Sequence, residues 1–300
     1  MFEHAWVESA VCSEPGDTER PLQHLLDEAV ERWPARPAVE FMRKLISYRE
    51  LGALVDHAAA GLQKLGVGPG VPVALHLPIT PHVPIAFFAV LKAGGTLVDC
   101  STLTGEAALC SALESSRSEV LITLAAHDWY EPIRQSLQTA HLKRIVVGTR
   151  AQFAAQPDAL IAEQRERGEQ VEVPVDGRHI RFGQLLRNDG RLAAQPIELR
   201  DRAVAVLRYA GGDGEVLTHA ALSATVKQSV KQCADAACRA DSMLAGSEPD
   251  SRAAAPLSDA RTLLTDMLLC VQLGALQRLG GNNDRLVLHP MVAAHNYRSN

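Results

Sequence analysis

A glycine-rich stretch has the residue types and the order that phosphate binding requires. It runs from Tyr209 to His219 and follows an apolar run, 203–209, that is typical of a β-strand. A helical pattern then begins near Thr218, which gives the order strand, glycine loop, helix. Glycines let the backbone approach a ligand closely, and the amide groups and dipole of a helix N-terminus favour an anion. The candidate phosphate-binding residues are therefore Gly211, Gly212, Gly214 and Thr218.

The same stretch lacks the positive charge that usually accompanies such a site. It carries Asp213 and Glu215 and contains no lysine or arginine. A carboxylate about 4 Å from a phosphate charge is repelled by roughly 1 kcal/mol in water and by about 4 kcal/mol at a half-buried site. Two interpretations remain open: a residual anion site, or a tight turn from strand to helix in which Thr218 is the helix N-cap. We favour the turn.

Alternating strands and helices are expected to hold this stretch in place. Apolar runs predict strands at 38–41, 45–48, 71–77, 96–99, 120–124, 144–147 and 203–209, with a further strand at 285–288. Helical spacing predicts helices at 22–33, 51–65, 84–93, 106–115, 130–138 and 257–279, a solvated helix at 163–169 and a short buried piece at 182–186. This alternation predicts an α/β fold with mainly parallel sheets and flanking helices.

Composition excludes several classes of protein. The chain has 300 residues, 47% of them hydrophobic, which is enough for one large or two small domains. A formal net charge of -5 gives no basic excess, so we expect no nucleic-acid partner. No apolar stretch is both long and uncharged enough for a transmembrane segment, and the N-terminus lacks the order of a secretory signal, so we expect a cytoplasmic protein. Neither the six cysteines nor the histidines have metal-ligand spacing, and no metal site is expected.

Four segments between Leu22 and Leu124 carry a resemblance to a known family. They are Leu25–Val30, Trp33–Ala38, Tyr48–Leu51 and Ala89–Gly95. They resemble the opening helix, the tyrosine turn and the Gly-Gly helix end of the adenylate-forming (AMP-binding) acyl-CoA synthetases, and among these the bacterial long-chain fatty-acid CoA ligases. The similarity resumes around 142–147 and 178–186. The resemblance implies the fold of the N-terminal part of that family's large domain.

The resemblance also covers both ends of the glycine stretch. The family's phosphate loop has the form Tyr-Thr-Gly-Gly-Thr-Thr-Gly-x-Pro-Lys-Gly, followed by Leu-Thr-His. Tyr209–Gly212 and Leu217–His219 match its ends, but the four residues 213–216 stand where the pattern has nine. The difference removes roughly 17 Å of extended chain. Losing one donor to the transition state costs on the order of a hundred- to a thousandfold in rate, so the resemblance implies that no catalytic residue is retained.

Other parts of the family are expected to be missing. The family has a second nucleotide-binding motif, an acid that holds magnesium, an aspartate on the ribose and a mobile C-terminal domain, and none of these fits before Asn300. Pro256–Asp259 also departs from the family's Pro-x-x-His near the acyl entrance. We therefore expect an acyl-CoA-synthetase-like region at 1–239, a flexible linker at 240–256 and a divergent helix and tail at 257–300.

These observations predict a truncated, degenerate homologue that acts by binding or interaction and carries no catalytic residue. No cofactor is expected. ATP with magnesium and CoA would enter only in the alternative, a fatty-acid CoA ligase activity that needs a partner chain. The expected partners are a fatty acyl ligand or an intact homologous ligase. A gene remnant with an exposed apolar face is a further possibility.

Overall fold

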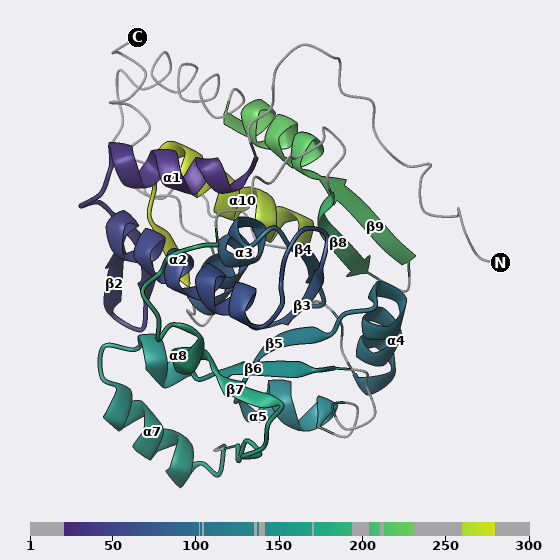
Figure 1. Cartoon of the computed structure of the whole chain (residues 1–300). Coiled ribbons are helices and arrows are strands. Elements are labelled where there is room, and N and C mark those ends of the chain that lie inside the picture. Colours follow the sequence, from purple (N-terminus) through teal and green to yellow (C-terminus); the bar gives the residue numbers. More distant parts are fainter. Residues whose placement is uncertain are drawn as a thin grey trace, which may run out of the picture.

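The computed structural model describes residues 21–101, 103, 105–134, 137, 142–169, 171–193, 204–210, 213–230 and 260–279. These residues form two β-sheets with helices packed against them (Figure 1). The expected α/β architecture with a mainly parallel sheet is confirmed.

The larger sheet has seven strands in the order β7-β6-β5-β3-β4-β8-β9. Their bounds are β3 (Pro72–His76), β4 (Thr96–Asp99), β5 (Val120–Leu124), β6 (Arg144–Gly148), β7 (His179–Arg181), β8 (Val204–Ala210) and β9 (Asp213–Thr218). Every neighbouring pair is parallel except β8 and β9. Every residue of β4 and β5 is buried, because helices cover both faces of a parallel sheet.

The larger sheet separates the apolar core into two layers, each covered by its own helices. Helices α1 (Gln23–Arg32), α2 (Tyr48–Lys64), α3 (His82–Lys92) and α10 (Ala260–Leu273) contribute to one apolar cluster. Helices α4 (Glu106–Ser116) and α5 (His127–Tyr130), with the 3-10 turn η1 (Glu131–Ile133), contribute to the second. The 3-10 turn η2 (Arg150–Phe153) and helix α8 (Phe182–Leu185) close the first cluster near β6. Helix α7 (Pro157–Glu166) buries no residue, which agrees with the solvated helix expected nearby.

The smaller sheet joins two distant parts of the chain. Its order is β10-β1-β2, with β1 (Pro37–Phe41), β2 (Lys44–Ser47) and β10 (Gln277–Leu279). β10 lies parallel to β1, so the expectation of one helix through residue 279 is wrong. The helix ends at Leu273 because Gly274 adopts a φ of 62° and the chain then turns into the strand. The Tyr48 hydroxyl donates to the carbonyls of Cys270 and Ala275, at 3.1 and 2.8 Å, and fixes this end against α2.

Polar contacts fix the ends of the helices. Ser47 Oγ accepts from the Glu50 amide and the Glu50 carboxylate accepts from the Ser47 amide, a capping box that begins α2. Lys92 Nζ lies 2.6 Å from a carboxylate oxygen of Asp27 and 2.6 Å from one of Asp56, which ties α1, α2 and α3 together. Burial acts to lower the pKa of Lys92, but the two hydrogen-bonded carboxylates raise it above its ordinary value.

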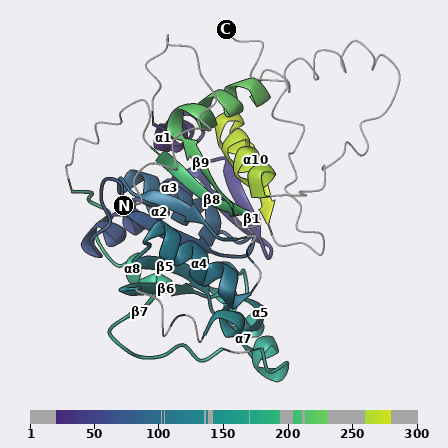
Figure 2. The ribbon, with the colours of Figure 1, turned by 90° about the vertical axis from the view of Figure 1, so that its right-hand side faces the viewer.

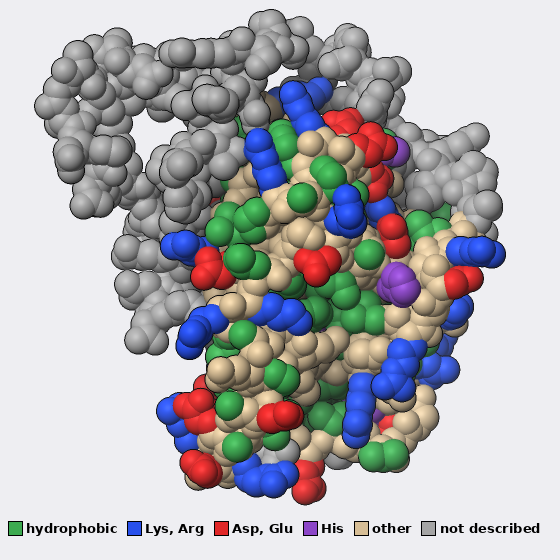
Figure 3. Space-filling model, turned by 90° about the vertical axis from the view of Figure 1, so that its left-hand side faces the viewer, with side chains coloured by type: hydrophobic (Ala, Val, Ile, Leu, Met, Phe, Trp, Pro, Cys, Tyr) green, Lys and Arg blue, Asp and Glu red, His purple; other side chains and the backbone are tan. Residues whose placement is uncertain are grey.

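The surface has no strong charge separation on the face shown in Figure 3. Basic and acidic side chains are interspersed there among small apolar groups. None of the helices that the structure describes is both long enough and apolar enough to cross a lipid bilayer.

Candidate functional site

The two sides of the glycine-rich stretch pair with one another as the strands of a β-hairpin. β8 and β9 are antiparallel, and their pairing continues as far as Ala210 opposite Asp213. Gly214 lies inside β9 opposite Tyr209, and Glu215 lies opposite Arg208. Only two residues therefore connect the paired strands.

The expected glycine-rich turn from strand to helix between Tyr209 and Thr218 is wrong in its second half. Residues 213–218 are a strand because they pair with β8 in antiparallel register, and a Gly-Gly pair between two strands is a strong signal for a two-residue turn. Gly214 is placed in the sheet ladder. Gly211 and Gly212 lie outside the described residues. Gly214 and Thr218 therefore lie near opposite ends of the same strand, β9.

Thr218 begins the helix over residues 219–230. Its Oγ1 accepts a hydrogen bond from the amide of Ala221 at 3.1 Å, which is the N-cap geometry that we expected. The next residue, His219, is buried and its Nδ1 accepts from the backbone N–H of Leu22 at 3.3 Å. Burial lowers the pKa of His219 to about 4. A neutral imidazole keeps Nδ1 free to accept, so both residues have structural contacts.

The hairpin turn lies at the edge of the sheet where ligands bind in many α/β proteins. β8 is parallel to β4, and β4 to β3, so Ala210 lies at the same edge as the carboxyl ends of β3, β4 and β5. The chain passes from β3 to β4 on one side and then to β5 on the other, so the topological switch point lies between β3 and β5. Ligands in open α/β sheets bind at such points. The hairpin lies at the same carboxyl edge, with β4 between β8 and β3.

A small cavity lies at the same carboxyl edge. Its volume is about 20 Å³, and its walls are Leu75, Leu77, Val83, Phe87, Leu97, Asp99, Ser101 and Leu264. A water molecule needs roughly 10 to 15 Å³ measured in this way, so the cavity admits one group of that size. It is far too small for a nucleotide or an acyl chain. Asp99 is the register partner of Arg208, which is in turn opposite Glu215, so strand β8 of the hairpin lies directly beside β4 and strand β9 lies one strand further out.

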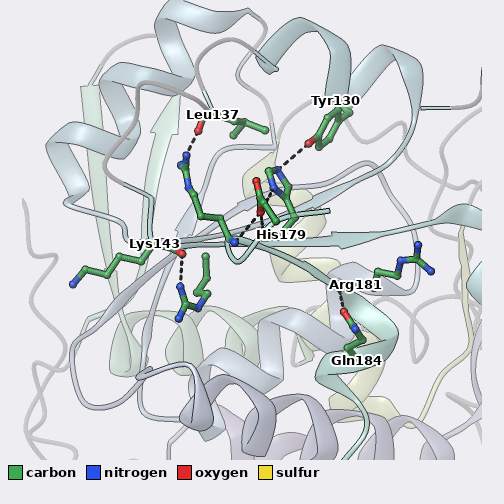
Figure 4. A network of polar contacts seen from close by, with 9 residues as sticks. Tyr130, Leu137, Lys143, His179, Arg181 and Gln184 are labelled. Carbon is green, nitrogen blue, oxygen red and sulfur yellow. Dashed lines mark hydrogen bonds and ion pairs between the residues drawn. The ribbon is translucent and has the colours of Figure 1, made fainter. Parts of the chain in front are cut away.

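A second cluster of polar side chains lies around β7, the outermost strand on the side of the sheet away from β9 (Figure 4). Asp176 Oδ1 lies 2.9 Å from His179 Nδ1, and His179 Nε2 lies 3.0 Å from the Tyr130 hydroxyl. Hydrogen bonds from the backbone and side chain of His179 lower the pKa of Asp176 to about 2. The order carboxylate, imidazole, hydroxyl is that of a nucleophilic triad. However, Tyr130 is 1% exposed and burial raises its pKa, so the phenol is not an activated nucleophile. The contacts join α5 to β7.

A buried histidine also lies near β6 without a catalytic arrangement. His82 is fully buried between the rings of Phe153 and Phe182. Its Nε2 donates to Gln152 Oε1 at 3.3 Å, and Thr80 Oγ1 lies 3.2 Å from its Nδ1. Burial lowers the pKa of His82 to about 4, so the ring is neutral in the core. Within the part of the chain that the structure describes, no three His, Cys, Asp or Glu side chains are grouped as metal ligands.

The fold is similar to that of solved acyl-activating ligases. A mutant form of coronafacic acid ligase from Pectobacterium brasiliense matches with a TM-score of 0.63 and 14% identity, over 88% of this chain and 46% of the ligase. Benzoate CoA ligase from Burkholderia xenovorans matches with a TM-score of 0.53 and 22% identity, over 69% of this chain and 36% of the ligase. At these identities the likeness concerns the fold alone. The shared feature is the α/β fold with a mainly parallel seven-strand sheet.

Sequence comparison identifies the family. The family model described as AMP-binding enzyme matches residues 26–290. The chain therefore belongs to the AMP-binding enzyme family.

Relatives from different branches are about equally similar. Tyrocidine synthase 2 of Brevibacillus parabrevis is 34% identical over 36% of this chain. The salicyl-AMP ligase / salicyl-S-ArCP synthetase of Mycobacterium tuberculosis is 33% identical over 43%, and the long-chain-fatty-acid--CoA ligase of Bacillus subtilis is 32% identical over 35%. The chain spans 3%, 24% and 19% of these relatives, respectively. The identities do not single out the fatty-acid branch.

Proposed function

We propose that this family member does not adenylate a carboxylic acid by itself and acts by binding. One observation carries the proposal: strand pairing continues to Ala210 and Asp213, so the turn at the carboxyl edge of the sheet has two residues. A triphosphate needs several donors that surround it, and a two-residue turn supplies few. The chemistry of the flanking residues points the same way, because Asp213 and Glu215 carry the charge that repels phosphate. Neither the length nor the charge of this hairpin fits ATP.

The proposed ligand is an acyl or aryl carboxylate derivative, or a protein that carries one. The named activities of the relatives support this class, since they include salicyl-AMP, fatty-acid and benzoate CoA ligases. An intact homologous ligase is the proposed protein partner.

A thermal-shift series tests which of the candidate ligands the chain binds. The purified chain is heated with ATP and magnesium, AMP, CoA, palmitate, salicylate or benzoate. A ligand at a hundred times its Kd adds about 2.7 kcal/mol to the unfolding free energy. We expect no shift with ATP and magnesium up to millimolar concentration, because a two-residue turn supplies too few donors to hold the phosphates. A saturable shift with ATP would contradict the proposal.

The matched control replaces the hairpin acids with their amides. The variant Asp213→Asn/Glu215→Gln keeps the strand length and removes both charges. If turn length limits binding, as we propose, the variant still shows no thermal shift with ATP and magnesium up to millimolar concentration. Micromolar ATP binding by the variant would show that charge alone is the obstacle.

A second candidate is ligase activity that requires a partner chain. The share of the solved ligases that the chain spans, 46% and 36%, favours testing it. Co-expression with the remaining half of an intact homologue would give a stable complex that forms acyl-AMP. Failure to form either complex or product rejects this candidate.

A further inference from the structure

A hydrogen bond connects the helix that follows the hairpin to the start of α1. His219 Nδ1 accepts from the backbone N–H of Leu22, a residue 197 positions away in the sequence. Leu22 is the N-cap residue of α1 and caps it with no side-chain hydrogen bond of its own. One of the N–H groups that a helix start leaves unsatisfied is thus satisfied from the far part of the chain. Figures 1 and 2 both place α1 and the green helix over residues 219–230 at the same end of the molecule.

Burial makes this contact costly to lose. Leu22 is 0% exposed and His219 is 9% exposed, so water cannot readily replace the acceptor. Leu22, Leu26 and Ala29 belong to the main core cluster, and the helix end depends on the position of Leu22. The docking of α1 and the position of His219 are therefore energetically linked.

His219 also depends on the hairpin. It follows directly after β9, and the cap from Thr218 to Ala221 fixes the first turn of its helix. Hairpin, cap, His219 and Leu22 thus form a continuous series of contacts. We propose that His219 is a latch that couples the position of the β8–β9 hairpin to the docking of α1. A molecule that displaces the hairpin releases α1 and loosens the core beneath it. This coupling is independent of whether the chain binds ATP.

Hydrogen exchange in a double-mutant cycle tests the latch. Exchange of the α1 amides is measured in the wild type, Thr218→Ala, His219→Ala and the double variant, relative to the amides of β5. Thr218→Ala is expected to speed α1 exchange several-fold in the wild-type background, although the hydrogen bond of the Thr218 side chain is to its own helix and not to α1. In the His219→Ala background, where α1 already exchanges about tenfold faster, it should add nothing.

Two controls keep the cycle decisive. His219→Asn retains an acceptor and is expected to keep α1 exchange within about threefold of the wild type. If Thr218→Ala leaves exchange over 219–230 unchanged, Leu222→Ala takes its place in the cycle. It is a stronger perturbation because it removes a buried side chain from the same helix. The latch is rejected if either perturbation speeds exchange over 219–230 but leaves α1 unchanged, or if its effect on α1 is equal in both backgrounds.

Discussion

Acidification from pH 6.5 to pH 4 is expected to remove about 5 kcal/mol from the unfolding free energy, roughly 2.5 kcal/mol for each of two buried histidines. Burial lowers the pKa of His82 and of His219 from 6.5 to about 4. Between these values the unfolded chain binds protons that the folded chain does not, so stability falls as the pH falls, and the contribution of the two histidines levels off below pH 4. Urea unfolding at several pH values measures this slope.

Matched histidine variants assign the effect. His82→Gln and His219→Asn are each expected to remove about half of the slope between pH 6.5 and 4. His127→Ala, at a side chain that is 59% exposed, is the matched surface control. An unchanged slope in the double variant His82→Gln/His219→Asn would show that other groups carry the acid sensitivity.

Gly274→Ala is expected to cost about 3 to 4 kcal/mol of unfolding free energy. The residue has a φ of 62°, which costs an alanine roughly 1 to 2 kcal/mol. Its Cβ would also lie 2.3 Å from Cε3 of Trp33, and overpacking of this kind typically costs 1 to 3 kcal/mol. Because Gly274 connects α10 to β10, we also expect faster hydrogen exchange across the pairing of β10 with β1.

Gly70→Ala separates the two causes. Gly70 has a similar φ of 73°, but a Cβ there would meet nothing within 4 Å. We expect this variant to cost only the backbone strain of about 1 to 2 kcal/mol. Equal losses in the two variants, measured by urea unfolding, would exclude the clash with Trp33.

Much of the fold follows from local patterns in the sequence. The strands β4 and β5 begin and end where continuous apolar runs do, because both of their faces are buried and turn residues bound them. The helix α2 was predictable from its apolar stripe. At the candidate site, the N-cap role of Thr218 was predictable for the same reason: the hydrogen bond joins residues three apart.

The remaining features depend on contacts that a local pattern does not contain. β10 is a strand because it pairs with β1, and residues 277–279 alone resemble the continuation of a helix. The role of His219 depends on Leu22, 197 residues away. β9 is a strand and not part of the expected glycine loop because residues 213–218 pair with β8, a contact that the glycine pattern alone does not contain, although a Gly-Gly pair is a signal for a hairpin. β7, three residues long, was too short to recognise.

Several sequence predictions concern residues outside those that the structure describes. They include the linker at 240–256, the acyl-entrance segment Pro256–Asp259 and the strand at 285–288. These stay predictions.

Adenylation of a carboxylic acid is the step that we expect the two-residue hairpin turn not to support. Exchange of labelled pyrophosphate into ATP by the purified chain measures that step directly, with palmitate, salicylate and benzoate supplied in turn. An intact ligase of the family, assayed in parallel, shows that the assay detects the reaction. We expect no exchange of pyrophosphate into ATP above the level measured without added acid. Exchange that depends on any of these acids would contradict it.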